Sequence, residues 1–191
     1  MTILILGLVI FLGVHSVRIV SEGWRAQTIG RIGAKPWKGV YSIVSIVGFG
    51  LIVWGFGLAR QQPVQLWSPP TGMRHLAALL MLIAFVLLAA AYVPGNDIKA
   101  HLHHPMVLAV KVWALAHLLA NGNLAHMVLF GAFLVWAVLN FSAARRRDRR
   151  ANTVYARGKT RATVTTVVVG VAAWALFAFW LHGLLMGVRP L

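Results

Sequence analysis

Residues 124–150 read LAHMVLFGAFLVWAVLNFSAARRRDRR. The stretch opens with an apolar segment, 124–143, and a helix that crosses a membrane needs about 20 such residues. It closes with five arginines and one aspartate at positions 145–150. Cations that flank an apolar run are typical of the cytoplasmic side of a membrane helix. This stretch therefore predicts a transmembrane helix followed by a cytoplasmic basic segment.

The rest of the chain has the same character. Of its 191 residues, 60% are apolar and 11% are charged, whereas soluble domains average about 25% charged residues. These values argue against a soluble globular enzyme and against a disordered chain. Apolar stretches predict helices at 2–20, 39–59, 73–93, 105–120, 124–143 and 164–186. We therefore predict an all-α, polytopic membrane helical bundle with about six transmembrane helices, in which residues 1–191 form a single integral membrane domain.

The distribution of charge predicts the orientation. The net charge is +15, from 18 Lys and Arg against 3 Asp and Glu. The segment between the fifth and sixth predicted helices carries eight cations, and the segment around Asn121 carries none. The positive-inside rule then places both termini in the periplasm and residues 145–150 in the cytoplasm. We expect the cations to contact anionic membrane lipid, with no nucleic-acid partner.

The chain has no cysteine and eight histidines. The absence of cysteine excludes disulfides, thiolate metal sites and iron–sulfur clusters, but it leaves histidine ligands available. His15 lies within the first predicted helix, on one face with Arg18 and Glu22, and His117 lies near the outer end of the fourth. An ionisable residue inside a span is a candidate functional group. The alternative is a buried histidine satisfied by a hydrogen bond.

The other histidines form two sets. His101, His103 and His104 precede Pro105, which suits the first turn of a helix. They could bind a transition metal, but without a nearby carboxylate pair a solvated interfacial loop is favoured. The second set consists of His75, His126 and His182, which lie near outer helix ends and could form a polar cluster with His117.

Two further patterns concern packing. Trp113 lies one turn before His117 on the same face, where it could line a pocket or pack in the bundle. The repeated glycines Gly48-Phe49-Gly50 and Gly55-Phe56-Gly57 predict a close contact between helices rather than a nucleotide site.

Three motifs carry a family resemblance. They are His15-Ser16, Trp37-x-Gly-x-Tyr41-Ser42 and the run His104-Pro105 … Trp113-Ala-Leu-Ala-His117 … Asn121-Gly122. Together they resemble the NnrU family of bacterial membrane proteins. The name of that family refers to genes near those for nitric oxide and nitrite reduction. The resemblance therefore implies an accessory role in denitrification at the bacterial inner (cytoplasmic) membrane.

The resemblance also implies a cofactor. A related branch, the ζ-carotene isomerases, uses haem b, with ligands in a His-Ser motif and a Trp-x-x-Ala-His motif. Carried over, the haem ligands here are His15 and His117, with Trp113 in the pocket wall and Arg18 as a partner for a propionate. A third histidine of the isomerases falls near Phe56 and is absent here.

Three functions follow from these features. The first and preferred function is a haem-dependent accessory factor with a membrane redox partner. The alternatives are a haem-dependent isomerase or oxidoreductase of a carotenoid-like substrate and a haem-free membrane scaffold. At 1.5 Å per residue, His15 lies about 6 Å inward of the midplane and His117 about 7 Å outward. A haem shared by both histidines would therefore need a tilted porphyrin.

Overall fold

The computed structural model describes residues 1–190 and is built from helices. The apolar stretches form α1 (Thr2–Val20), α3 (Ala34–Ala59), α4 (Met73–Tyr92), α6 (Pro105–Ala120), α7 (Leu124–Arg150) and α8 (Thr160–Leu176). The last of these continues through a π-helical turn, η1 (Phe177–Leu181), into α9 (His182–Met186). Five of the helical segments are long and apolar enough to cross a membrane, and α6 is shorter. The predicted all-α membrane bundle is confirmed.

The main differences from the predicted helices lie where the sequence is polar. α2 (Glu22–Ile32) and α5 (Asp97–Leu102) occupy segments that we expected to be loops. The side chain of Asn96 caps α5 by accepting a hydrogen bond from the backbone N–H of Lys99, at 2.7 Å. α7 continues past residue 143 to Arg150, because arginine is a good helix former.

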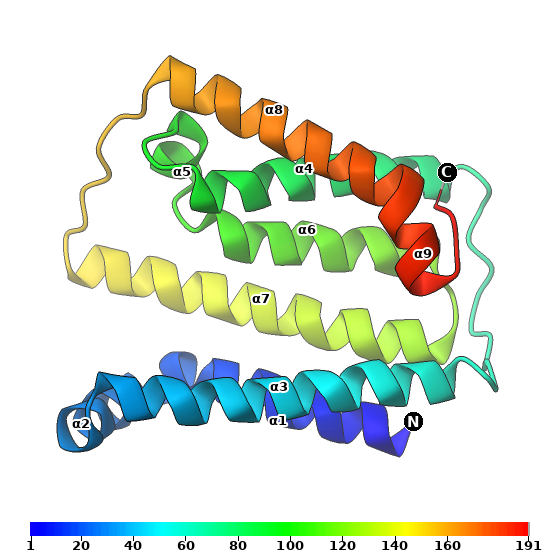
Figure 1. Ribbon diagram of the computed structural model, residues 1–191, viewed down its shortest axis with the longest axis horizontal. Coiled ribbons are helices and arrows are strands. Elements are labelled where there is room, and N and C mark those ends of the chain that lie inside the picture. The colour runs from blue at the N-terminus through cyan, green and yellow to red at the C-terminus, as the bar shows by residue number, and fades with distance from the viewer. Residues whose placement is uncertain (191) are drawn as a thin grey trace.

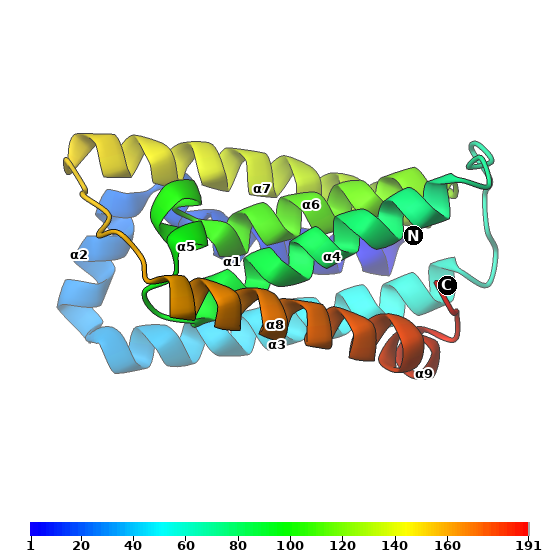
Figure 2. The same cartoon turned by 90° about the horizontal axis from the view of Figure 1, so that it is seen from above.

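The long helices lie side by side, and the connections gather at two ends of the molecule (Figures 1 and 2). One end, here called the basic end, carries α2, α5 and the arginines 145–150 at the end of α7. The other, here called the terminal end, carries both chain termini, α9 and the α6–α7 turn. Both termini therefore lie at the same end, as an even number of crossings requires. The side of the membrane that each end faces stays a prediction.

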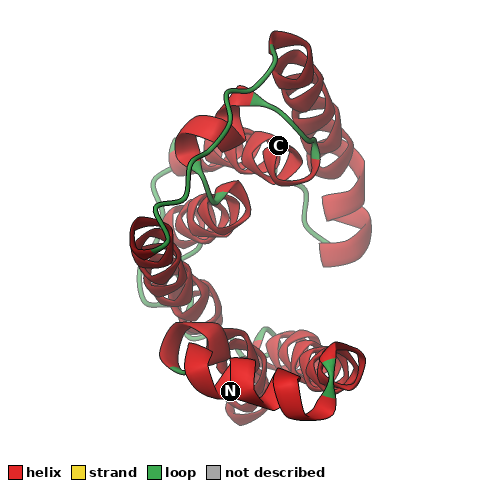
Figure 3. Cartoon of the chain, turned by 90° about the vertical axis from the view of Figure 1, so that its left-hand side faces the viewer, coloured by secondary structure: helices red, strands yellow, loops and turns green. Residues whose placement is uncertain are grey.

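Seen along the helices, the bundle is an open arc (Figure 3). Contacts between neighbours give the order α3, α1, α7, α6, α4 and α8 along this arc. α7 and α6 therefore occupy the middle, and α1 with α3 and α4 with α8 form its two arms. The helices that carry His15 and His117 are separated by α7.

Glycines bring α1 and α3 into close contact, as predicted. A Cβ at Gly48 would lie 2.8 Å from the backbone nitrogen of Phe11, and one at Gly55 would overlap the backbone of Leu4. The same test finds open space at Gly50 and Gly57. Only one glycine of each predicted pair therefore serves the contact, because only that glycine faces α1.

At the terminal end, the α3–α4 connection is tied to the α6–α7 turn. The N–H of Leu66 donates to the carbonyl of Gly122, and that of Leu124 donates to the carbonyl of Val64, each at 2.8 Å. These bonds hold the connection between the two arms against the turn between the two middle helices. They position the end of α6, where His117 lies.

Candidate functional site

His15 faces a cavity of about 730 Å³ toward the basic end, here called the His15 cavity. Its walls come from α1, α2, α3, α6 and α7. The imidazole of His15 lies between aromatic side chains. Phe11 stacks on it at 4.2 Å between ring centroids, Tyr41 lies at 5.1 Å and Trp136 lies edge-on at 6.1 Å. The cavity therefore presents one half-buried imidazole among flat aromatic surfaces.

A backbone carbonyl fixes the tautomer of His15. Nδ1 lies 2.7 Å from the carbonyl oxygen of Phe11, one helical turn earlier. A carbonyl oxygen only accepts, so Nδ1 carries the proton and donates it. Nε2 is then left with a lone pair, and among residues 1–190 it makes no hydrogen bond. Metal-ligating histidines are commonly oriented by such a bond from the other ring nitrogen.

Cations surround the His15 cavity. Arg18, Arg25, Lys38 and Arg147 line it, whereas no carboxylate of the described chain does. The guanidinium groups of Arg18 and Arg25 pair with Glu22, at 3.1 and 3.2 Å, outside the lining. Within residues 1–190, Lys38 has no ion pair. The cavity is therefore suited to a ligand with negative charge at its edge.

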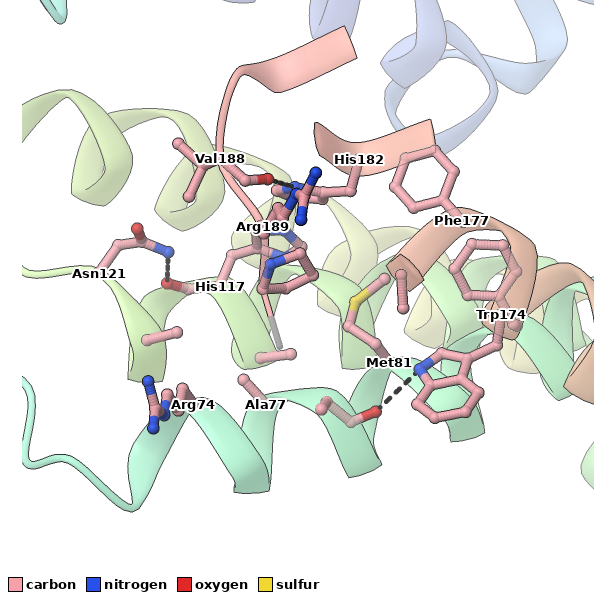
Figure 4. A pocket seen from close by; sticks show the side chains of 16 residues that line it. Arg74, Ala77, Met81, His117, Asn121, Trp174, Phe177, His182, Val188 and Arg189 are labelled. Atoms are coloured by element: carbon pink, nitrogen blue, oxygen red, sulfur yellow. Dashed lines mark hydrogen bonds between the residues drawn. The ribbon is translucent and has the colours of Figure 1, made fainter. Parts of the chain in front are cut away.

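His117 lies in a different pocket, of about 310 Å³, at the terminal end (Figure 4). This His117 pocket is formed by α4, α6, α8, η1, α9 and residues 188–190. The Nδ1 of His117 donates to the carbonyl of Trp113, at 2.9 Å, so its Nε2 also keeps a lone pair. Phe130 stacks on the His117 ring at 4.4 Å. The two histidines thus share one local geometry but not one cavity.

Aromatic side chains fill the space between the two histidines. Phe11, which stacks on His15, lies 5.9 Å from Phe133 between ring centroids. Phe133 lies 5.3 Å from Trp113, which lies 5.4 Å from His117. Trp113 lines neither cavity, so it serves the packing role that the sequence left open. The structure brings Arg18 together with His15 and Trp113 together with His117. A single iron held by both histidines stays a prediction.

A cluster of polar side chains surrounds Asp148 at the basic end. The Nε2 of His104 lies 2.8 Å from the Asp148 carboxylate, and the hydroxyl of Tyr155 donates to the same oxygen at 3.0 Å. Nδ1 of His103 lies 4.0 Å from this oxygen. Burial and the hydrogen bond to Asp148 raise the pKa of Tyr155, whereas burial and the charge of Arg145 lower the pKa of His103.

The surroundings of His101 therefore differ from those of His103 and His104. His101 is exposed, as expected, but it lies in α5 rather than in a loop, and its Nδ1 donates to the carbonyl of Asp97 at 2.8 Å. His103 and His104 are partly buried against Asp148, which is not the solvated loop that we expected. Within residues 1–190, no group of three or more His, Cys, Asp or Glu is arranged to hold a metal ion. A positive φ of 67° at His103 also separates α5 from α6.

The family model for NnrU protein matches residues 3–190. The chain belongs to the NnrU family. The match spans all the membrane helices, so both the His15 cavity and the His117 pocket lie within the NnrU region. No curated protein and no solved structure matches the chain.

Several residues of these NnrU sites were not predicted. Tyr41 and Trp136 line the His15 cavity, and Arg74, Trp174 and Arg189 line the His117 pocket. Arg74 and Arg189 could have been identified as candidate binding residues from the sequence, because they are cations on the side of the membrane that is predicted to be poor in cations. Asp148 is 44 residues from His104, and no local pattern connects them.

The predicted cluster of outer histidines is formed in part. His182 and His117 line the same pocket of this NnrU protein. His126 is separated from His117 by Phe130, which contacts both rings, at 5.9 and 4.4 Å. His117 and His182 therefore share one pocket, and His126 lies on the other side of Phe130, so these histidines do not form a single group.

Proposed function

We propose that this NnrU protein binds haem b in the His15 cavity, with His15 as the axial protein ligand, and that it serves nitric oxide and nitrite reduction. The observation that carries the proposal is the unprotonated Nε2 of His15, which lies in a cavity of about 730 Å³. A neutral imidazole is the usual protein ligand of haem iron in several haem families. A haem held there would supply the capacity to bind a small molecule such as nitric oxide.

The residues of the His15 cavity fit such a group. Its volume is within the range of about 300–1,000 Å³ that is common for cofactor pockets. Trp136 and Tyr41 supply flat apolar surface, and Lys38 and Arg147 supply cations for propionate carboxylates. Arg18 lines the cavity too, but its guanidinium already pairs with Glu22. Lys38 and Arg147 are therefore the stronger propionate partners.

In this proposal, His117 is not a ligand of the haem that His15 binds. Phe11 and Trp113 both contact Phe133, and each lies four residues from its histidine. At 1.5 Å per residue, His15 and His117 are therefore offset by about 12 Å along the bundle. This offset is between backbone positions, and each imidazole extends several ångströms from its backbone, so the offset alone does not separate the two ring nitrogens. We favour His15 alone over the pair that the resemblance implies because the two histidines line different cavities, with Phe133 and Trp113 between them.

The role in nitrogen-oxide reduction rests on membership of the NnrU family. Deletion of the gene in a denitrifying host should slow the consumption of nitrite or nitric oxide by intact cells. A plasmid with the wild-type gene should restore the rate, and one with His15→Ala should not. Unchanged consumption after the deletion would contradict the role without bearing on haem binding.

Haem binding is tested on the purified protein in mild detergent. We expect titration with haem b to give a saturable Soret band with one haem per chain. His15→Ala should lose it, whereas His101→Ala, which changes an exposed histidine at the same end, should keep it. Retention of the same band by His15→Ala would reject the site. A Soret band absent from the wild type would reject the haem.

A further inference from the structure

Among residues 1–190, the terminal end carries cationic side chains and no acidic side chain. The three acidic residues of the chain are Glu22, Asp97 and Asp148, which lie in α2, in α5 and near the end of α7. All three are therefore at the basic end (Figure 1). The terminal end holds Arg60, at the end of α3, together with the two arginines of the His117 pocket. Cations at the end predicted to be periplasmic are unusual and call for a partner.

Within the described residues, one of these three arginines has a hydrogen-bond partner. Arg60 donates to the carbonyl of Met186, at 3.1 Å. Arg74 and Arg189 make no hydrogen bond or ion pair through their guanidinium groups within residues 1–190, and both line the His117 pocket. Two exposed positive charges thus stand at the edge of one pocket with no negative group of the described chain beside them.

The local structure directs Arg189 to this edge. Gly187 ends α9 in the left-handed conformation, with φ of 70°, which glycine adopts without strain. The chain then turns back, and Nδ1 of His182 donates to the carbonyl of Val188 at 2.6 Å. A Cβ at Gly183 would lie 3.3 Å from the Arg189 side chain. The segment after α9 is therefore folded back over the pocket rather than extended away from it.

The interior of the His117 pocket is apolar. Met81, Phe85 and Phe177 line it, and the rings of Phe85 and Phe177 lie 5.6 Å apart between centroids. The ring N–H of Trp174 donates to the carbonyl of Ala78 at 3.1 Å (Figure 4). Phe177 opens the π-helical turn η1. Such turns are rare and occur frequently at functional sites. The pocket thus joins an apolar interior to a cationic edge.

We infer that the His117 pocket binds a membrane-soluble molecule that has an acyl chain and an anionic head, carboxylate or phosphate. The guanidinium groups of Arg74 and Arg189 bind the head, since arginine forms paired hydrogen bonds with both kinds of anion. Met81, Phe85 and Phe177 contact the chain. A free fatty acid and an acidic phospholipid both have this chemistry. This inference is independent of haem binding, because the His15 cavity lies elsewhere.

The first test uses dodecanoate with a photoreactive diazirine near the end of its chain. On irradiation with the purified protein, we expect labelled peptides from 77–85 and 174–182. Unlabelled dodecanoate and dodecyl phosphate should compete, and dodecanol should compete about tenfold less well because it lacks the charge. Equal competition by dodecanol, or labelling spread over the outer faces of the helices, would overturn the inference.

The second test removes the charges. Arg74→Gln with Arg189→Gln should weaken binding of the probe by about tenfold. The matched control, Arg157→Gln with Arg161→Gln, removes two exposed cations elsewhere and should leave binding unchanged. Both double variants should keep the Soret band of the haem-loaded protein, so failure of this inference and failure of the haem proposal are distinguishable. Equal binding by the two double variants would overturn the inference.

Mass spectrometry of lipids released from the purified protein separates the two sources. A fatty acid or an acidic phospholipid, reduced in the Arg74→Gln, Arg189→Gln protein, supports the inference. Neutral lipid alone, in equal amounts from both proteins, would contradict it.

Discussion

The His15 cavity and the His117 pocket use the same imidazole geometry at opposite ends of one bundle. In each, Nδ1 donates to the carbonyl four residues earlier, and an aromatic ring stacks on the imidazole. The cavities differ in volume, about 730 against 310 Å³, and in the helices that form them. An oriented histidine is therefore not sufficient to define a cofactor site. The space and charge around it decide what can bind.

The sharpest difference between the two ends is the side of the membrane that each faces. Because the native chain has no cysteine, single cysteines can report this difference directly. Val154→Cys marks the basic end, at a residue that is 91% exposed, and Val64→Cys marks the terminal end. In intact spheroplasts, an impermeant maleimide should label Val64→Cys fully and Val154→Cys only after lysis. The reverse pattern would invert the orientation.

The α1–α3 contact supports the His15 cavity but not the His117 pocket. Gly55→Val would force the backbones of α1 and α3 apart, and we expect a stability loss of about 3 kcal/mol or more. Haem binding should be lost, while labelling of the His117 pocket by the photoreactive dodecanoate persists. Gly50→Val adds the same side chain where no atom lies within 4 Å and is the control. If both variants lose haem equally, the contact does not support the cavity.

The cations of the His15 cavity should affect haem affinity to a smaller extent. Lys38→Glu places a negative charge at the cavity edge, and we expect haem affinity to fall by about three- to tenfold at low salt. Lys35→Glu makes the same change outside the lining and should have little effect. Spectrophotometric titration with haem at two salt concentrations measures the haem affinity of each variant. Equal effects of the two variants would show a general charge effect rather than a contact.

The smallest expected effect is on pH dependence at the basic end. The pKa of His103 lies below its ordinary value because burial and Arg145 disfavour its charge, so the unfolded chain binds the proton more readily. The contribution of His103 to the free energy of unfolding is fully present above about pH 6.5 and decreases as the pH falls below that value. The protection factors for amide hydrogen exchange of residues 97–104, which correct for the slower intrinsic exchange at low pH, should therefore decrease between pH 7 and pH 5.

The surroundings of His103 define the control for this effect. Its charged or titratable neighbours are Arg145, Asp148, His104, Tyr155 and His101, of which His101 has the smallest effect on its pKa. His103→Asn removes the titration and tolerates the positive φ. The decrease in protection should be smaller in this variant and largely retained in His101→Asn. A decrease of equal size in His103→Asn and the wild type would assign the effect to another group.

The fold was predictable because membrane helices are determined by local composition. The apolar stretches 2–20 and 105–120 match α1 and α6, and Pro105 starts α6 as expected. α2 and α5 were missed because their sequences are polar and their helices depend on position at the membrane surface or on a cap such as Asn96. The end of α7 was missed because arginine favours helix beyond the apolar segment.

The site was predictable only in its individual residues. The helical rise already indicated an offset between His15 and His117, and the structure separates them into two cavities. Tyr41, Trp136 and Asp148 reach their partners only through packing of distant helices, which no local pattern specifies. Their roles therefore required the arrangement of α7 between α1 and α6.

Replacement of each histidine by glycine, with and without imidazole, tests the central claim most directly. His15→Gly removes the ring and leaves space that free imidazole can fill, so haem binding should be lost and then restored by imidazole. His117→Gly should retain the wild-type Soret band without imidazole, because its pocket is separate. If His117→Gly loses haem and imidazole restores it, or His15→Gly keeps the wild-type spectrum unaided, His15 is not the sole protein ligand.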